Sequence, residues 1–302
     1  FGFDGEDPAR IAVIAVDGPI VRGRSSLFAR DREAAAQTIV DAVKDAREDK
    51  RVKAIILRVS SPGGSYVASD TILHALSAAR AGGLPVIVSM SDMAASGGYF
   101  VALAADHVVA HPNTITGSIG VVSGKLNLAG LLAEYGIRTD SVSAGRNADM
   151  FSMTKPFSAA ESARLDAVLD TIYEDFTTKV AAARRLGPAE IDAAARGRVW
   201  SGLDAKRIGL VDVLGGYAEA EGLARDAAGI APESRTAMVA YPEARQDLDA
   251  FMTALEEGEI GESVSRLDAL LTFIRYSGII ESVLNNTGGG RIAASAPPLT
   301  VR

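Results

Sequence analysis

The strongest constraint on the fold of this chain is a pattern that occurs twice between residues 52 and 105. Each time, a short apolar run leads into a glycine-containing loop and then into a segment with helical character. Short apolar runs bounded by turn residues are typical of buried strands. Repeated strand, loop and helix units indicate right-handed crossovers and a largely parallel sheet. We therefore predict an α/β fold.

The two glycine loops are expected to lie at the same edge of that sheet. SPGG at residues 61–64 follows the strand predicted at 53–59, and ASGG at residues 95–98 follows the strand predicted at 85–90. Open α/β folds bind their ligands at the carboxyl ends of the strands. The sequence therefore predicts a functional site between these loops.

Ser96 is the candidate nucleophile of this site. It lies between small residues and directly precedes Gly97, where a short apolar helix is predicted to begin. Acyl transfer produces an oxyanion, and free backbone N–H groups at such a turn would stabilise it. Gly97 and the Gly63-Gly64 pair are the expected donors. Taken alone, SGG is more often a simple turn, because serine and glycine are common turn residues; the second glycine loop favours a site.

The rest of the chain extends the same pattern. Further strands are predicted at residues 11–16, 107–111, 119–123, 138–143 and 236–241. Helices are predicted at residues 33–48, 67–81, 128–135, 158–185, 188–195, 217–228, 248–257 and 264–284. Residues 158–161 read as a capping box for the longest helix. We expect a catalytic domain over residues 1–230, a helical extension over 231–284 and a flexible tail over 285–302.

Composition excludes several classes of function. The chain has no cysteine and only three histidines, without a metal-binding pair, so neither a metal site nor a serine–histidine–aspartate triad is expected. The net charge of −7 and the lack of a dense Lys/Arg run argue against nucleic acid as a partner. No apolar run approaches the roughly 18 residues that cross a bilayer. No cofactor is expected.

Four ordered motifs carry a resemblance to a known family. SPGG at residues 61–64, AASGGY at 94–99, TGSIG at 116–120 and RVWSGLDAKRIGLVDVLGG at 198–216 together resemble bacterial signal peptide peptidase A. This resemblance implies a serine–lysine peptidase with the Clp/crotonase-type fold of repeated ββα units and C-terminal helices. It covers about residues 11–228, and the segment after 242 is similar to the tail of the double-length members.

The resemblance also assigns roles to individual residues. It implies that Ser96 is the nucleophile, that Gly63, Gly64 and Gly97 form the oxyanion hole, and that Ser118 hydrogen-bonds a catalytic lysine. A lysine kept neutral by desolvation would take the proton of the serine, which explains why no histidine is needed. Met93, Ala95 and Tyr66 are expected to line the substrate cleft.

The chain departs from the family pattern at the lysine. Ala148 occupies the matching position in the loop before the long helix, and Arg146 cannot replace a neutral base because its guanidinium stays protonated. Lys125 and Lys155 are more simply explained as solvated surface lysines. In double-length members the serine lies in the C-terminal half and the lysine in the N-terminal half. We therefore expect this chain, which begins at Phe1, to be an excised or processed serine-bearing half.

The expected activity is hydrolysis of cleaved signal peptides on the periplasmic side of the bacterial inner membrane. The lysine would come from an N-terminal half or an adjacent protomer, within a ring-shaped oligomer. Two alternatives stay open at this point. One is a non-catalytic assembly protein that keeps the fold without the base. The other, less favoured, is a crotonase-like acyl-CoA enzyme, which would need an acidic base such as Asp92 and a basic patch for the phosphates.

Overall fold

A computed structural model describes residues 8–25 and 33–242 of the 302-residue chain. In chain order the strands and helices are β1 (Ala9–Asp17), β2 (Ile20–Val21), β3 (Ala34–Ala35), α1 (Ala36–Glu48), β4 (Val52–Ser61), α2 (Tyr66–Ala81), β5 (Val86–Ala95), α3 (Gly97–Ala102), β6 (His107–Ala110), β7 (Ile115–Gly117), α4 (Ala129–Glu134), α5 (Ala159–Arg184), α6 (Pro188–Ala194), β8 (Val199–Ser201), α7 (Gly202–Arg207), β9 (Val213–Leu214), α8 (Tyr217–Ala227) and β10 (Thr236–Tyr241).

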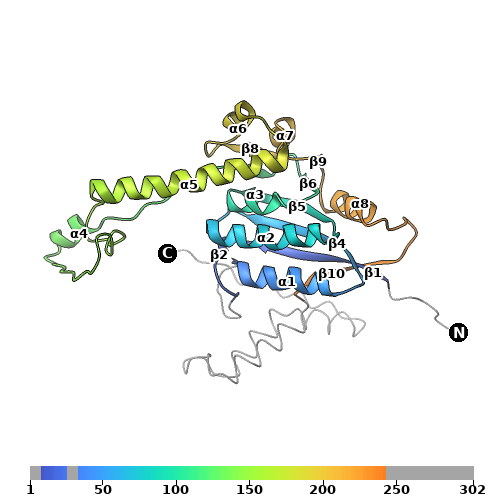
Figure 1. Ribbon diagram of the computed structural model, residues 1–302, viewed down its shortest axis with the longest axis horizontal. Helices are drawn as coiled ribbons and strands as arrows, with labels where there is room; N and C mark the ends of the chain where they lie inside the picture. The colour runs from blue at the N-terminus through green and yellow to red at the C-terminus, as the bar shows by residue number, and fades with distance from the viewer. Residues whose placement is uncertain (1–7, 26–32, 243–302) are drawn as a thin grey trace, which may run out of the picture. The chain divides into compact units, whose positions relative to one another are not determined.

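The main sheet confirms the predicted α/β fold. Its strands follow the order β10-β1-β4-β5-β6-β9, and every pair along this path is parallel (Figure 1). β7 extends the sheet by pairing in parallel with the end of β5, and β8 pairs with β7 in the antiparallel sense. The sheet is therefore mostly parallel.

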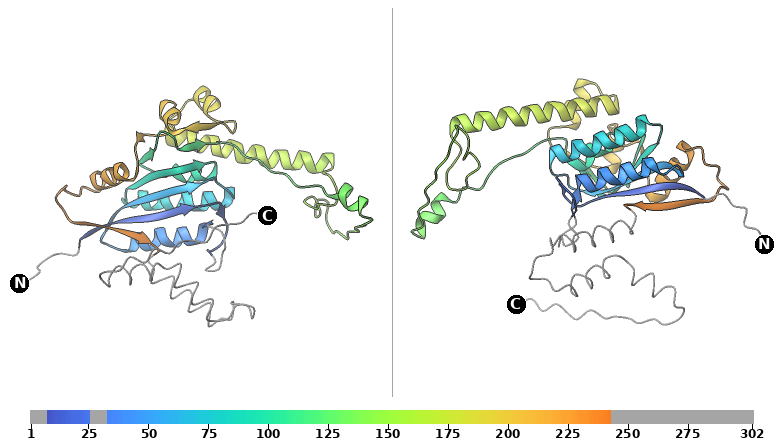
Figure 2. Two further views of the ribbon diagram at one scale, coloured as in Figure 1. Left: turned by 180° about the vertical axis from the view of Figure 1, so that it is seen from behind. Right: turned by 60° about the horizontal axis from the view of Figure 1, so that its bottom comes forward.

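Helices cover both faces of the sheet, and β4 shows how the sequence dictates this. Its apolar run alternates between two buried clusters because successive side chains of a strand point to opposite faces. Ile55, Leu57 and Val59 pack in the cluster that includes α1, α2 and α3. Ala54 and Ile56 pack in a second cluster with residues of α8 (Figure 2). The continuous apolar run at residues 54–57 is therefore buried on both faces of the sheet.

The longest helix begins and ends as its sequence suggests. The Ser158 hydroxyl accepts the N–H of Glu161, and the Glu161 carboxylate accepts the N–H of Ser158, which confirms the predicted capping box. The helix ends where Arg185 adopts a left-handed conformation, with φ of 56°. Only its C-terminal half buries large apolar side chains, Phe176 and Val180.

Two predicted strands are wrong, and both fall after β7. Residues 119–123 and 138–143 contain no strand, and the strand in this part of the chain is instead β7, at Ile115–Gly117. Residues 121–157, which we call the arm, include α4 and lie beyond the edge of the sheet (Figure 1). Apolar β-branched residues such as Val142 suggested a strand, but none forms because no neighbouring strand supplies hydrogen-bond partners.

The sheet continues past the domain boundary expected at residue 230. β10 pairs in parallel with β1 from Ala9↔Thr236 to Ile14↔Tyr241, so residues 236–241 form an edge strand of the same sheet. The helices predicted at 248–257 and 264–284, and the tail from 285, lie outside the described residues.

Candidate active site

Ser96 lies in a sharp turn between β5 and α3. Its backbone has φ of 53° and ψ of −118°, an uncommon conformation for a residue with a side chain, which costs on the order of 1–3 kcal/mol. Two hydrogen bonds hold it there: its N–H donates to the carbonyl of Gly117 (2.9 Å), and its carbonyl accepts the N–H of Phe100 (2.8 Å). Every residue of α3 is buried, so the turn stands on a rigid base.

The SPGGS loop lies directly against this turn. A Cβ built on Gly63 would be 2.5 Å from the nitrogen of Gly97 and 2.9 Å from the Cβ of Ser96. A Cβ built on Gly97 would be 3.2 Å from the nitrogen of Gly64. Only glycine permits this approach, and Gly63 also needs it for its φ of 99°. The two glycine loops predicted to meet are therefore brought together.

Gly63 and Gly64 of this loop differ in the hydrogen bonds that their N–H groups make. The N–H of Gly63 donates to the Ser61 hydroxyl (3.1 Å) and its carbonyl accepts the N–H of Ile20 (2.8 Å). Within residues 8–25 and 33–242, the N–H groups of Gly64 and Gly97 have no protein acceptor. These two donors, rather than that of Gly63, are free to bind a negatively charged oxygen beside Ser96.

Ser118 shares a cavity with Ser96. β7 pairs with the end of β5, with Gly117 opposite Ala95, and this register brings the next residue, Ser118, to the nucleophile turn. Ser118 also has a positive φ, of 49°, and its N–H donates to the carbonyl of Arg198 (2.7 Å). A cavity of about 400 Å³ is lined by both serines together with residues 120–122, residues of α5 and the loop before β8: Gly120, Val121, Val122, Leu169, Asp170, Tyr173, Arg196 and Gly197.

A second, more apolar cavity also includes Ser96. Its volume is about 270 Å³, and it includes Tyr66 and both free donors. The remaining lining residues are Pro62, Ser69, Ser96, Phe100, Gly120, Val121, Val122, Ile172 and Phe176. Met93 and Ala95 line neither cavity; both lie in the part of β5 that pairs with β7, and Ala95 is buried. Of the three expected cleft residues, only Tyr66 lines one of these two cavities.

No lysine among the described residues lines either cavity. Lys155, in the arm, forms ion pairs with Asp149 (2.8 Å) and Glu161 (3.0 Å), and hydrogen bonds to these carboxylates raise the pKa of Lys155. Lys125 donates to the carbonyl of Met150 and lies over the Phe157 ring. Ala148 lies in the same arm. None of these residues provides a neutral amine beside Ser96.

The contribution of α5 to the site was missed from the sequence. In the sequence, Leu169, Ile172 and Phe176 follow the i, i+3 and i+4 spacing of the apolar face of a helix. All three line the cavities beside Ser96. Helical spacing identifies which residues of α5 face inward, but it cannot show that this face covers the site and not another part of the core.

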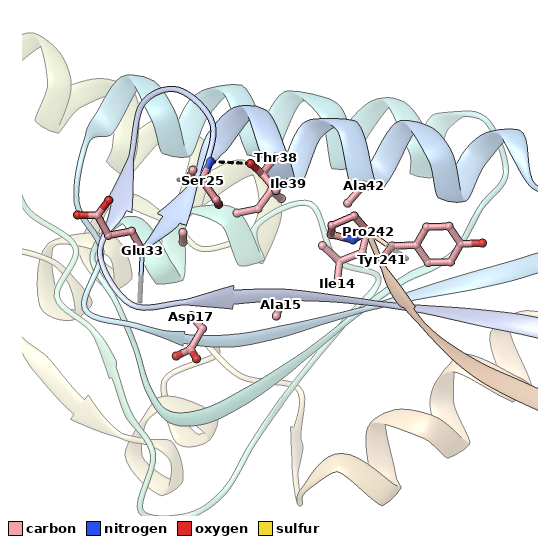
Figure 3. A pocket seen from close by; sticks show the side chains of 12 residues that line it. Ile14, Ala15, Asp17, Ser25, Glu33, Thr38, Ile39, Ala42, Tyr241 and Pro242 are labelled. Carbon is pink, nitrogen blue, oxygen red and sulfur yellow. Dashed lines mark hydrogen bonds between the residues drawn. The ribbon is translucent and has the colours of Figure 1, made fainter. Parts of the chain in front are cut away.

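A separate cavity of about 230 Å³ lies between β1, α1 and the end of β10 (Figure 3). Ile14, Ile39, Ala42 and Tyr241 form much of its wall, and the N–H of Ser25 donates to the Thr38 hydroxyl at one end (2.9 Å). It shares no residue with the cavities at Ser96.

Residues 8–25 and 33–242 contain no group of three or more His, Asp or Glu side chains that could hold a metal ion. In the same part of the chain, no helix combines the length and the apolar character needed to cross a membrane.

Comparison with known proteins agrees with this geometry. The chain is 44% identical over 210 residues to Protease 4 of Salmonella typhi, a match that covers 70% of this chain and 33% of that protein. It is 33% identical over 253 residues to the chloroplastic serine protease SPPA of Arabidopsis thaliana, covering 83% of this chain and 37% of that protein. A third relative, from Enterococcus faecium and provisionally named signal peptide peptidase SppA, is 32% identical over 72% of this chain and 62% of its own length.

The first two of these relatives are much longer than the match, and the chain spans only about a third of their length. Residues 78–231, about half of the chain, match the model of peptidase family S49. This segment contains Ser96, Ser118 and the motif at residues 198–216, so the family match and the geometry of the site concern the same residues. The chain belongs to peptidase family S49.

Proposed function

We propose that this chain is the serine-bearing part of a serine–lysine peptidase. The observation that carries the proposal is the turn at Ser96, where a strained serine lies beside two backbone donors without protein acceptors. In this reaction the Ser96 Oγ attacks the scissile carbonyl carbon while a neutral lysine takes the hydroxyl proton. The carbonyl oxygen becomes an oxyanion that accepts hydrogen bonds from Gly64 and Gly97. The lysine then gives the proton to the departing amine.

The substrate that we propose is an unfolded peptide with apolar side chains, and in particular a cleaved signal peptide. The cavity beside Ser96 and the two donors has aromatic and aliphatic walls, including Tyr66, Phe100, Ile172 and Phe176. A pocket of this kind suits the leucine- and alanine-rich segments of signal peptides. The provisional name of the relative from Enterococcus faecium agrees with this substrate. We propose that the reaction takes place on the periplasmic side of the bacterial inner membrane.

The lysine is proposed to come from another chain or from another part of a longer protein. Among the residues that the structure describes, none that lines the cavity shared by Ser118 and Ser96 is a lysine, and Ser118 would hydrogen-bond the incoming amine there. The arm supports an assembly of several protomers around this site, because its large apolar side chains are exposed: Val122, Leu126, Leu131, Tyr135, Ile137, Val142, Phe151 and Met153. Exposed apolar surface of this extent marks interaction sites. A ring that encloses the sites is the arrangement we propose.

A non-catalytic assembly protein is the second candidate, and the alanine at position 148 favours it. The two functions differ in whether Ser96 reacts. A fluorophosphonate probe that labels Ser96 in the presence of a lysine-bearing partner, but does not label the Ser96→Ala variant, would support the peptidase.

The deciding experiment measures cleavage of a short fluorogenic peptide rich in leucine and alanine. We compare this chain alone, this chain with a lysine-bearing N-terminal half, and the same mixture with Ser96→Ala. We expect cleavage only in the mixture with Ser96 intact. Cleavage by the chain alone that needs Ser96 would place the base within the chain, and Lys155→Ala would test it. No cleavage in any mixture would overturn the peptidase proposal in favour of the assembly protein.

A further inference from the structure

A cluster of charged residues from α2 and α5 lies directly behind the apolar cavity. The Lys179 ammonium donates to Asp175 (2.6 Å), one helical turn away on α5, and to Asp70 (2.8 Å) on α2. The Tyr66 hydroxyl donates to the same Asp175 oxygen that Lys179 contacts. We call Asp70, Asp175 and Lys179 the clamp, because they join the two helices through one ammonium group.

The clamp is in contact with the cavity wall through aromatic rings. The Lys179 ammonium lies 5.2 Å from the centroid of the Phe100 ring and 5.9 Å from that of Tyr66. The Tyr66 and Phe100 rings pack edge to face at 5.4 Å, and Phe100 packs in the same way on Phe176 at 4.9 Å. These three rings line the cavity that contains Ser96. The position of Lys179 therefore affects the shape of the cavity beside the nucleophile.

Lys179 is not available as the missing base. Partial burial by itself would lower the pKa of Lys179, but hydrogen bonds to Asp175 and Asp70 outweigh this effect and raise that pKa. Partial burial by itself would raise the pKa of Asp175, but hydrogen bonds from Lys179 and Tyr66 outweigh this effect and lower that pKa. Burial and the hydrogen bond to Asp175 raise the pKa of Tyr66 to about 12. Lys179, Asp175 and Tyr66 therefore keep their protonation states across the neutral pH range, as a fixed structural contact requires.

The clamp acts on Tyr66, the cavity residue that directly follows the SPGGS loop. Tyr66 is the first residue of α2, two positions after Gly64, and Ser65 between them caps the helix by accepting the N–H of Ala68. A ring held at its hydroxyl end by Asp175 and at its backbone by this cap has little freedom to rotate. The wall of the cavity therefore cannot move away to admit a larger side chain.

We infer that Tyr66 is a specificity-determining residue of the apolar cavity, and that Lys179 and its two carboxylate partners are positioning residues that fix it. This inference rests on the proposed function, since it assigns the selectivity of the same site. It predicts that the clamp restricts the cavity to aliphatic side chains of moderate size. Freeing Tyr66 allows its ring to swing aside and relaxes that restriction.

The test measures peptide binding, which needs no lysine base. In the Ser96→Ala background we titrate product-like octapeptides with a free carboxylate that end in Leu or in Trp, and we record Kd by fluorescence anisotropy. The carboxylate occupies the donors of Gly64 and Gly97, and the last side chain enters the cavity. We expect the Leu peptide to bind at least tenfold more tightly than the Trp peptide.

Two substitutions free the ring in different ways. Tyr66→Phe keeps the ring but loses the contact with Asp175, and Lys179→Met keeps an apolar side chain but removes the ammonium. Each is expected to reduce the ratio of the two Kd values at least fivefold. Lys179→Arg, which retains the positive charge, should preserve the ratio within twofold. Lys44→Met, which breaks an exposed i,i+4 pair with Glu48 on α1, is the matched control and should leave the ratio unchanged.

The outcomes separate this inference from the proposed function. An unchanged ratio in the folded Tyr66→Phe variant overturns the inference, because the clamp would then only join two helices. Failure of both peptides to bind also overturns it. Selective binding that Tyr66→Phe relaxes, combined with the absence of cleavage in every lysine-donor mixture, supports the clamp and overturns the peptidase. If Lys179→Met does not fold, Tyr66→Phe and Lys179→Arg decide the matter.

Discussion

The turn at Ser96 and the arm at residues 121–157 join at the same cavities, but their packing is opposite. Around Ser96 every residue of α3 is buried, and strand pairing, the first turn of α3 and closely packed glycines fix the backbone. In the arm, α4 has no buried residue, and side chains such as Val142 and Tyr135 are exposed. The contrast teaches that packing within this chain already fixes the serine turn and its two backbone donors. Under the proposed function, the lysine base would approach from the side where the surface is unpacked.

Loss of the proposed nucleophile Ser96 should produce the largest effect, and it tests the tightly packed turn between β5 and α3. Ser96→Ala is expected to lower the cleavage rate of the mixture with a lysine donor by about 10³-fold or more, because no other group can form the acyl intermediate. The measurement is hydrolysis of the fluorogenic peptide. Ser123→Ala in the arm serves as the control and should retain activity. A residual rate within tenfold of the unmodified chain would show that Ser96 is not the nucleophile.

A methyl group in the oxyanion loop tests how closely the two loops approach. Gly63→Ala places a Cβ 2.5 Å from the nitrogen of Gly97, on top of the cost of a positive φ. The control Gly83→Ala has a similar φ of 86° with nothing within 4 Å, so it carries only the conformational cost of about 1–2 kcal/mol. We expect Gly63→Ala to lower the free energy of unfolding by at least about 2 kcal/mol more than Gly83→Ala. Urea unfolding measures both, and equal losses would contradict the close approach.

Charges on the arm should leave folding intact and weaken assembly. Leu131→Glu combined with Val142→Glu alters only exposed positions, so the free energy of unfolding should change by less than about 0.5 kcal/mol per substitution. Association with the lysine-bearing partner should weaken at least tenfold, as measured by sedimentation velocity. Leu203→Glu, at an exposed apolar position of α7, is the control. Unchanged association in the double variant would show that the arm is not part of the interface with the partner.

The smallest effect concerns the first turn of α5, where the arm ends. Hydrogen bonds from the Ser158 backbone and from Lys155 lower the pKa of Glu161 to about 2. Because the folded pKa is below the unfolded value, the contribution of Glu161 to stability is present above about pH 4.5. It is lost as pH falls towards 2. The protection factors of the amides at residues 161–163, which compare the observed exchange rate with the intrinsic rate at the same pH, should fall over that range in the unmodified chain. In Glu161→Gln the protection factors should already be lower at pH 6, and they should depend less on pH.

The sequence correctly predicted the elements whose apolar pattern matches the burial of their side chains in the fold. The apolar runs at β4 and β5 and the glycine loops after them were correct because strands buried on both faces leave little choice of register. The strands predicted at 119–123 and 138–143 were wrong because strand propensity was read without a partner strand. β7 was not predicted, since its three residues depend on pairing with β5 and β8 and not on their own composition.

The site was predicted in part, for similar reasons. Ser96, Ser118 and the glycine pair come together as expected, but the choice of Gly64 over Gly63 as donor follows from a hydrogen bond to Ser61 that no motif records. The clamp was missed because an aspartate and a lysine four residues apart are common on exposed helix faces. Only tertiary contact with Asp70 and Tyr66 distinguishes this pair.

The geometry of α5 has a mechanical consequence. Its 26 residues span about 39 Å, at about 1.5 Å per residue. The helix is anchored at one end, where Phe176 and Val180 are buried and Arg184 makes two hydrogen bonds with Asp212. A tilt of only about 5° at this anchor would displace the opposite end by about 3 Å, given the rise per residue. The helix thus behaves as a rigid rod that is held at its C-terminal end beside the core. A movement of the arm would therefore also displace Leu169 and Ile172 at the cavity walls, but by a much smaller distance.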